Sequence, residues 1–199
     1  MTDPKTGPTS PTRPQDYYVR HEHGSDRIIL EEARNLPRFP FAGILDNLRS
    51  AHNVGSIFRT SDGANASKIS LVGYTPTPEH RHLAKTALGA VDVVPWQHFE
   101  TVEEAIADAR TSGAQILALE LTENSVPLTE IELQFPVVLV AGNELDGLSP
   151  ETIALCDGTV HLPMCGHKNS LNVSVAFGIA LYEILRRYQL ESLTTEPAR

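Results

Sequence analysis

The chain has 199 residues, of which 41% are hydrophobic and 21% charged, and its formal net charge is −9. This length and hydrophobic content allow one well-buried core rather than two full domains. No run of about 18 apolar residues occurs, and the start MTDPKTGPTSPTRPQD lacks the apolar core of a secretory signal, so we expect a cytosolic protein without a membrane span.

The acidic residues are concentrated in one segment. Between Glu100 and Glu151, eleven acids accompany a single base, Arg110. From Arg20 to Phe99, nine Lys or Arg and six His accompany eight acids. Phosphate neutralisation needs basic side chains, so the net charge argues at first against a nucleic-acid partner. Its uneven distribution weakens that objection, because a locally neutral or basic face can still form.

The N-terminal segment divides into two parts. Four prolines among residues 1–16 predict an extended or disordered arm, which we interpret as a solvated tail rather than a binding arm. Residues 17–40 are expected to form a helical extension. Within it, SDRIILEEARNLP predicts a short helix with Ser25 as its N-cap and Pro37 as its stop.

The main domain is expected at residues 41–190, ahead of a flexible tail at 191–199. Here short apolar runs rich in β-branched residues alternate with helical patterns. The predicted strands are FAGILD (41–46), KISLVG (68–73), VDVVPW (91–96), QILALE (115–120), PVVLVAG (136–142) and GTVHLP (158–163). The predicted helices lie near 53–64, 79–88, 101–112, 149–155 and 170–188. This alternation predicts a mostly parallel α/β sheet covered by helices on both faces.

Three loops that follow predicted strands carry unusual polar sequences. They are DNLRSAHNVGSIFRT, GNELDGLSPE and MCGHKNSLNVS. In parallel α/β sheets, ligands lie beyond the carboxyl ends of the strands, so chemistry is expected in these loops. Neither GxGxxG nor GK[ST] occurs in the chain, which argues against a nicotinamide enzyme and against an NTPase with a P-loop.

The first loop places Asn53 and Arg59 six residues apart. If NVGSIFRTSDGA is helical, Asn53 is its N-cap and Arg59 follows nearly two turns later. The fixed fork of donors on Arg59 suits a phosphate or a hydroxyl. The alternative is a surface arginine paired with Asp62 or Asp46.

The second loop follows a strand that is expected to be buried. Gly142 lets a ligand approach the backbone closely, and Gly147 permits a positive φ. Asn143 and Glu144 project from the strand end with both donor and acceptor groups. A plain turn with solvent-facing acids is the alternative interpretation.

The third loop leads into the last predicted helix. Ser170 is a natural N-cap, and the free N–H groups of the first helical turn form a site for a carboxylate or a phosphate. Asn172, within the first turn, either braces the preceding loop by hydrogen bonds or serves only as a structural cap.

The last predicted helix is apolar on nearly every side. From Val173 to Tyr182 its only exceptions are Ser174 and Gly178, and a helix that is hydrophobic all round must be buried all round. One side can pack on its own sheet. We expect the other side to meet a second copy of the chain through a two-fold interface. In the alternative, the N-terminal helix covers that side.

The cysteines and histidines form no metal motif. Cys156 and Cys165 lie nine residues apart without a CxxC, and we interpret them as buried reduced thiols. The pairs HEH (21–23) and HRH (80–82) have no third ligand at motif spacing, so we expect exposed histidines.

Together the three loops resemble the signature motifs of the SpoU/TrmH-type RNA 2′-O-ribose methyltransferases of the SPOUT superfamily. RSAHNVGSIFRTSDGA is similar to the first motif, VVLVAGNELDGLS to the second and LPMCGHKNSLNVSVAFGIALYE to the third. The match covers residues 41–188 in order. It implies an α/β domain with a C-terminal trefoil knot, an exception to the rule that chains avoid knots.

The resemblance also implies a cofactor and a reaction. The reaction is methyl transfer from S-adenosylmethionine to a ribose 2′-hydroxyl of tRNA or rRNA, and it needs no metal. The cofactor binds in the knot, largely through backbone groups. By position, these groups belong to Leu119, Gly142, Leu162 and Leu171.

Five residues of the motifs are implied to be catalytic: Asn53, Arg59, Glu144, Ser170 and Asn172. The enzyme is implied to act as a homodimer, in which Arg59 of one subunit completes a site built on the other. A guanidinium stays protonated at neutral pH, so we expect Arg59 to orient the ribose hydroxyl rather than to act as a base. With Ser170 and Glu144, it would stabilise the developing alkoxide.

Two other functions stay open on the sequence. One is a catalytically silent RNA-binding module of the same fold, although the intact motifs weigh against it. The other is a small-molecule methyltransferase, which the acidity of the chain makes conceivable. Besides the three motifs we recognise no separate RNA-binding domain in the sequence. The motifs alone identify neither the RNA nor the nucleotide.

Overall fold

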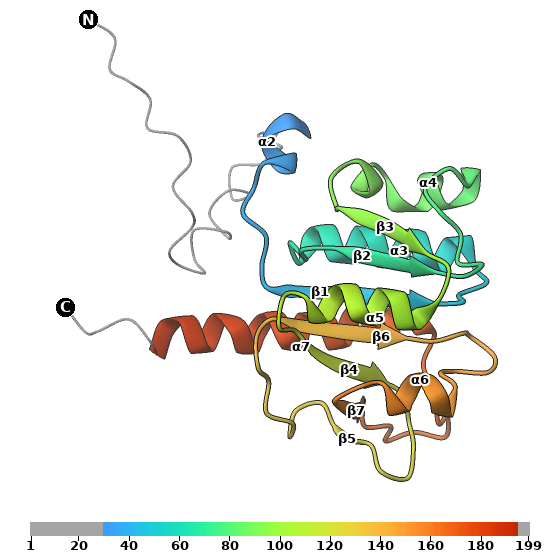
Figure 1. Ribbon diagram of the computed structural model, residues 1–199, viewed down its shortest axis with the longest axis vertical. Helices are drawn as coiled ribbons and strands as arrows, with labels where there is room; N and C mark the ends of the chain where they lie inside the picture. The colour runs from blue at the N-terminus through green and yellow to red at the C-terminus, as the bar shows by residue number, and fades with distance from the viewer. Residues whose placement is uncertain (1–29, 195–199) are drawn as a thin grey trace, which may run out of the picture.

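The computed structural model of the chain describes residues 30–194, in which one sheet has helices on both faces (Figure 1). Seven strands of this part pair in parallel in the order β3-β2-β1-β6-β4-β7-β5. The strands are β1 (Phe41–Asp46), β2 (Ile69–Val72), β3 (Trp96–Phe99), β4 (Gln115–Leu119), β5 (Val126–Pro127), β6 (Val137–Ala141) and β7 (Gly158–His161). The helices are α2 (Leu30–Arg34), α3 (Ala51–Gly63), α4 (Arg81–Ala87), the 3-10 helix η1 (Ala90–Asp92), α5 (Val102–Arg110), α6 (Pro150–Ala154) and α7 (Val173–Thr194). The predicted parallel α/β sheet is confirmed.

One predicted strand, at residues 91–96, is wrong. Leu88 (φ 50°) and Gly89 (φ 92°) take left-handed conformations that end α4 and turn the chain into η1. The strand β3 begins only after Pro95, whose missing N–H cannot donate to a sheet ladder. The two-residue strand β5 was not predicted, because so short a run has no periodic pattern.

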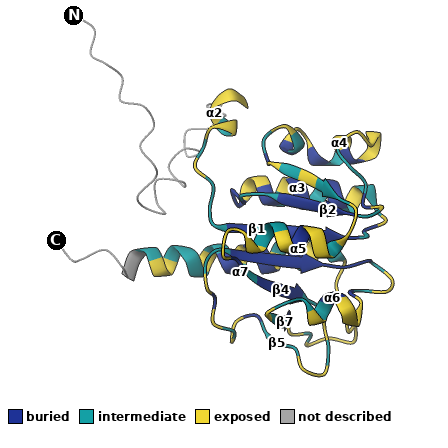
Figure 2. Cartoon of the chain, viewed as in Figure 1, coloured by how far each residue is buried: buried dark blue, intermediate teal, exposed yellow. Residues whose placement is uncertain are grey.

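The sheet separates two hydrophobic cores, and Figure 2 shows that its central strands are buried between them. Successive side chains of a strand point to opposite faces. In β1, Leu45 therefore belongs to the core under α3 and α7, whereas Ile44 belongs to the core under α5 and α6. The residues at the carboxyl ends of the central strands are thus held rigidly from both sides.

A glycine in β1 allows α7 to approach the sheet. A Cβ atom added to Gly43 would lie 2.6 Å from the Phe177 ring, closer than non-bonded carbon atoms approach. Phe177 is fully buried, together with Ala180, Leu181 and Ile184 of the same helix. This packing fixes where the first turn of α7 lies relative to the sheet edge.

The other side of α7 is exposed. Val175, Ile179 and Tyr182 have relative exposures of 49%, 48% and 48%, and their spacing places them on one face of the helix. Within residues 30–194 the single chain therefore leaves this side uncovered, and its burial against a second copy stays a prediction. The helix also starts later and ends later than predicted, at Val173 and Thr194, so the first residues of the expected tail at 191–199 are helical.

The described part of the N-terminal segment packs elsewhere. The Arg34 guanidinium donates to the Asp92 carbonyl of η1 at 2.7 Å, and Arg38 donates to the Val93 carbonyl at 2.7 Å. Residues 30–38 thus lie against η1 and do not provide the alternative cover for α7. The predictions for residues 1–29, including the Ser25 cap and the HEH pair, fall outside the described residues.

The two cysteines differ in their surroundings. Cys156 is half-buried, and its burial raises the pKa of the thiol to about 11. Cys165 is exposed, so the prediction of a buried thiol is wrong there. Among the helices of residues 30–194, none combines the length and the hydrophobicity that a membrane crossing needs.

Candidate functional site

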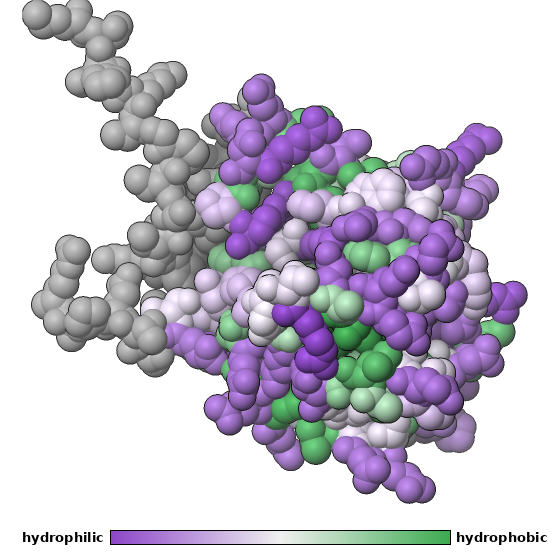
Figure 3. All heavy atoms as spheres, viewed as in Figure 1, coloured by the Kyte–Doolittle hydropathy of each residue, from purple (hydrophilic) through white to green (hydrophobic). Residues whose placement is uncertain are grey.

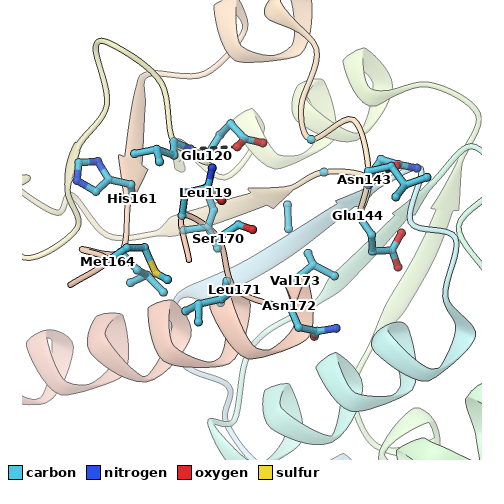
Figure 4. A pocket seen from close by; sticks show the side chains of 18 residues that line it. Leu119, Glu120, Asn143, Glu144, His161, Met164, Ser170, Leu171, Asn172 and Val173 are labelled. Carbon is cyan, nitrogen blue, oxygen red and sulfur yellow. Dashed lines mark hydrogen bonds between the residues drawn. The ribbon is translucent and has the colours of Figure 1, made fainter. Parts of the chain in front are cut away.

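A cavity of about 380 Å³ lies where the carboxyl ends of β4, β6 and β7 meet the start of α7 (Figure 4). Its walls come from three stretches of chain, within residues 119–121, 141–147 and 161–176. The predicted second and third loops therefore converge on one cavity. Its volume falls in the range of about 300–1,000 Å³ that is usual for small-molecule sites.

All four residues expected to contact a cofactor line this cavity: Leu119, Gly142, Leu162 and Leu171. At Gly142 the space is taken by the loop itself, since an added Cβ atom would lie 2.5 Å from the carbonyl group of Gly147. Gly147 has φ 69°, a conformation that glycine adopts without strain. The two glycines let the loop fold back on itself and leave backbone groups at the cavity wall.

Glu144 joins the second loop to the start of α3. Its carboxylate accepts hydrogen bonds from the Arg49 N–H at 2.9 Å, the Ser50 N–H at 3.0 Å and the Asn53 side-chain amide at 2.9 Å. Burial works to raise the pKa of Glu144, but these donors together outweigh it and hold the pKa below its ordinary value. The carboxylate is therefore an ionised acceptor that is already engaged within the chain.

We expect Glu144→Gln to lower the melting temperature at neutral pH by a few degrees, because one amide oxygen replaces two carboxylate oxygens. The pKa of Glu144 is lower in the folded chain than in the unfolded chain, so its contribution is present above the acidic range. That contribution is lost as the pH falls through the folded-state pKa. Calorimetry at decreasing pH should show the melting temperatures of the wild type and of Glu144→Gln converge. A difference between them that does not depend on pH would assign the effect to packing.

The helix caps differ from the predictions. Ser50, not Asn53, is the N-cap of α3, and its hydroxyl accepts from the Asn53 N–H at 3.3 Å. Asn172, not Ser170, caps α7, because its side-chain oxygen accepts from the Ser174 N–H at 3.0 Å. Both predictions were wrong because Ser and Asn have similar capping preferences, so a short polar run does not fix the cap.

A chain of side-chain hydrogen bonds joins the three predicted motifs. The Asn172 amide donates to the Asn53 side-chain oxygen at 3.1 Å, and the Asn53 amide in turn donates to Glu144. Of the two alternatives for Asn172, bracing and capping, the structure shows both. Ser170 lines the cavity two residues earlier and is exposed.

Arg59 is the one predicted site residue that the structure brings neither to the cavity nor to the network. Its side chain is exposed, and it is not among the residues that line the cavity. Within residues 30–194 it forms no ion pair, so the alternative pairing with Asp62 or Asp46 is not observed. Asp46 instead accepts from the Asn47 side chain and from the Thr152 hydroxyl.

The family model described as the SpoU rRNA Methylase family matches residues 40–182. The chain belongs to this family. One similar protein is the tRNA (guanosine(18)-2′-O)-methyltransferase of Escherichia coli (strain K12), which is 34% identical over 145 residues. That alignment covers 73% of this chain and 62% of the relative, so the chain spans less than two thirds of that enzyme.

Solved SpoU structures share the fold. The TrmH/SpoU tRNA modifying enzyme of A. aeolicus superposes with a TM-score of 0.73 at 30% identity, and the match covers 85% of each chain. An rRNA methyltransferase of Sinorhizobium meliloti with bound AdoMet superposes with a TM-score of 0.69 at 32% identity, over 78% of this chain and 60% of that chain. The resemblance read from the three loops is thereby confirmed at the level of the family.

Two further residues contribute to this SpoU-type site: Glu120, which was not predicted from the sequence, and Asn143, which was expected at the strand end but without named partners. Glu120 accepts from the Leu121 N–H at 3.0 Å and from the Leu148 N–H at 3.0 Å, so it clamps the second loop. The Asn143 amide donates to the Asn47 carbonyl at 2.9 Å and to the Tyr74 hydroxyl at 2.8 Å. The available signal for Glu120 was an acid at the end of an apolar strand.

No group of three or more His, Cys, Asp or Glu side chains in residues 30–194 is arranged to hold a metal ion. The HRH pair at 80–82 is exposed, as expected.

Proposed function

We propose that the chain is an S-adenosylmethionine-dependent methyltransferase that modifies a ribose 2′-hydroxyl of tRNA or rRNA. The observation that carries the proposal is the convergence of the second and third motifs on one cavity, with the first motif tied to them through Asn53. The names of the E. coli and S. meliloti relatives support the RNA substrate and the cofactor.

The cavity fits the proposed cofactor. Gly142, Leu162 and Leu171 would hold it through backbone groups, and Leu119 also lines the cavity. When bound, S-adenosylmethionine supplies an activated methyl group on a sulfonium centre and leaves as a neutral thioether, so the proposed reaction needs no metal. Because Gly142 has no Cβ atom, the second loop can pack directly against it at the cavity wall.

The chain's own residues have distinct roles in the proposed reaction. Arg59 orients the ribose hydroxyl and its neighbouring phosphate. Its positive charge stabilises the alkoxide that develops as the hydroxyl proton passes to solvent water and the oxygen takes the methyl group. Ser170 can donate a hydrogen bond to the same oxygen from the cavity wall. Because three donors already occupy Glu144, we assign it and Asn53 to positioning the first loop. Asn172 holds the start of α7 beside them.

A second copy of the chain would complete this site. Val175, Ile179 and Tyr182 form an apolar stripe along the exposed side of α7, which is the kind of surface that homodimers bury. An added Cβ atom at Gly63 of α3 would lie 2.9 Å from the Tyr182 hydroxyl, so α3 runs directly beside the stripe. A two-fold interface there would bring Arg59 of one subunit toward the partner's cavity.

Two further parts of the proposal follow from the family. The segment between β7 and α7 is where the trefoil knot would form, and that knot stays a prediction. Since the proposed substrates are tRNA and rRNA, we propose that the protein works in the cytoplasm.

The function is tested by methyl transfer to RNA. Incubation with radiolabelled S-adenosylmethionine and RNA from cells that lack the gene should label tRNA or rRNA, and mapping of 2′-O-methyl groups should identify one position lost in those cells. Methylation of small metabolites but of no RNA would contradict the proposal. Tight RNA binding without turnover at any nucleotide would instead favour a silent RNA-binding module.

A further inference from the structure

A group of exposed basic and imidazole side chains lies on α3 and α4, outside the cavity. We name it the histidine surface, and it consists of His52, Arg59, His80, Arg81, His82 and Lys85, all of which are exposed. Hydrophilic side chains occupy the outer edge of the molecule where α4 lies (Figure 3). Neither the cavity nor the hydrogen-bond network uses these side chains, with the exception of Arg59 in the proposed reaction.

Three imidazole rings make contact on this surface. The ring centroids of His52 and His82 are 5.8 Å apart, and those of His80 and His82 are 5.7 Å apart. His52 is fixed further by a 3.0 Å hydrogen bond between its ring and the Thr86 hydroxyl. The neighbouring rings are tilted by 44° and 41° to each other, and within residues 30–194 no group of three or more His, Cys, Asp or Glu could hold a metal ion. We therefore interpret the rings as an aromatic patch.

The two helices present this patch as one surface. A Cβ atom added to Gly55 of α3 would lie 2.7 Å from the Leu83 carbonyl oxygen of α4, so the helices pack backbone to backbone. Arg59 lies seven residues after His52, which is two helical turns and therefore the same face of α3. The imidazole patch thus continues along α3 to the arginine that is proposed to act on the ribose.

The local charge opposes that of the whole chain. Residues 47–88 contain five Lys or Arg and two Asp or Glu, although the chain carries a net charge of −9. Both acids are exposed, but Glu79 accepts a hydrogen bond from the Thr77 hydroxyl, and Asp62 lies in the field of Arg38. The histidine surface is therefore a basic area on an acidic protein.

We propose that the histidine surface binds the RNA strand next to the methylated nucleotide. This inference rests on the proposed function, and it adds the surface that presents the substrate. Arg81 and Lys85 would neutralise phosphates, whereas the imidazole rings of His52 and His82 offer flat faces on which unpaired bases stack. An acidic chain would in this way recruit RNA through one local area and deliver it to Arg59.

The test compares three double variants of the full-length protein. Arg81→Gln with Lys85→Gln removes two phosphate contacts, and His52→Ala with His82→Ala removes two rings. The matched control is Thr129→Glu with Gln134→Glu, two exposed positions near β5 and β6 that change the net charge by the same amount as the first variant. Thermal melting confirms that each variant is folded.

RNA affinity and KM are measured with tRNA and rRNA from cells that lack the gene. We expect each surface variant to bind RNA about tenfold more weakly, with a similar rise in KM and an unchanged affinity for S-adenosylmethionine. The arginine–lysine variant should also make the negative slope of log affinity against log salt less steep by about 1.4 to 1.8, since two phosphate contacts are lost. The control should match the wild type.

The outcomes separate this inference from the proposed function. Wild-type RNA affinity in both surface variants, with methyl transfer intact, would overturn the inference and leave the proposed function standing. Equal weakening in the control would assign the effect to total charge and would also overturn it. A wild-type protein that neither binds nor methylates any RNA would overturn both.

Discussion

Arg59→Ala is expected to lower methyl transfer by about 10²–10³-fold, which is typical for removal of one group that stabilises a developing oxyanion. The affinity for S-adenosylmethionine should stay close to that of the wild type, because Arg59 does not line the cavity of its own chain. Single-turnover transfer to RNA and calorimetric titration of the cofactor measure the two quantities separately. The melting temperature should change little, since the side chain is exposed and makes no ion pair within residues 30–194.

The matched control for this prediction is Arg59→Lys. Lysine keeps the positive charge but lacks the planar fork that holds a hydroxyl and a phosphate at once. We therefore expect partial activity, above that of the alanine variant and well below that of the wild type. Loss of cofactor binding in Arg59→Ala, with normal transfer per bound cofactor, would contradict the role assigned to this arginine.

Two inactive variants are expected to restore activity when they share one dimer. Gly142→Val should abolish cofactor binding, because even its Cβ atom would lie 2.5 Å from the Gly147 carbonyl group. A heterodimer of Arg59→Ala and Gly142→Val subunits has one intact cavity, on the first subunit, and one intact arginine, on the second. If the arginine acts across the interface, these two form one complete site of two, and the purified heterodimer should have about half the wild-type activity.

The heterodimer experiment distinguishes an Arg59 that acts on the partner's cavity from an Arg59 that acts on the cavity of its own chain. If the arginine served its own chain, neither subunit would hold both parts, and the heterodimer would be as inactive as each homodimer. Co-expression of the subunits with two different tags and sequential purification provides the sample. As a control for the interface, Ile179→Glu places a charge in the apolar stripe of α7. Light scattering should show monomers, and the transfer assay should show no activity. An inactive heterodimer, or a fully active Ile179→Glu monomer, would contradict the proposed dimer.

The order of strands and helices followed from local pattern. Apolar runs at 41–46, 115–120 and 136–142 became β1, β4 and β6 within one or two residues of the predicted bounds, because a strand buried on both faces needs a continuous apolar run. The run at 91–96 also contains Asp92 and Pro95. After the left-handed turn at Leu88 and Gly89, its first two residues belong to η1, and β3 starts only at Trp96. Such a turn depends on packing that a propensity pattern does not contain.

The positions of the site residues along the chain were also readable from the motifs. Leu119, Gly142, Leu162 and Leu171 line one cavity as expected, because the carboxyl ends of parallel strands lie at the same edge of the sheet. Their catalytic or binding roles stay predictions that the experiments above test. The histidines of HRH were expected to be exposed, but their contact with His52 could not be predicted, since the rings meet only where α3 packs on α4.

The sequence by itself determined the alternation of strands and helices, the polar loops at the strand ends and the family, since hydrophobic period and motif spacing are properties of neighbouring residues. Only the tertiary structure decided which side chains of these loops form hydrogen bonds with one another. Glu144 and Asn53 are 91 residues apart, and Asn172 and Asn53 are 119 apart, so nothing local specifies that their amides and carboxylate meet. Arg59 lies on α3 outside the cavity of its own chain, and its spacing from the other motif residues along the sequence does not specify that placement either.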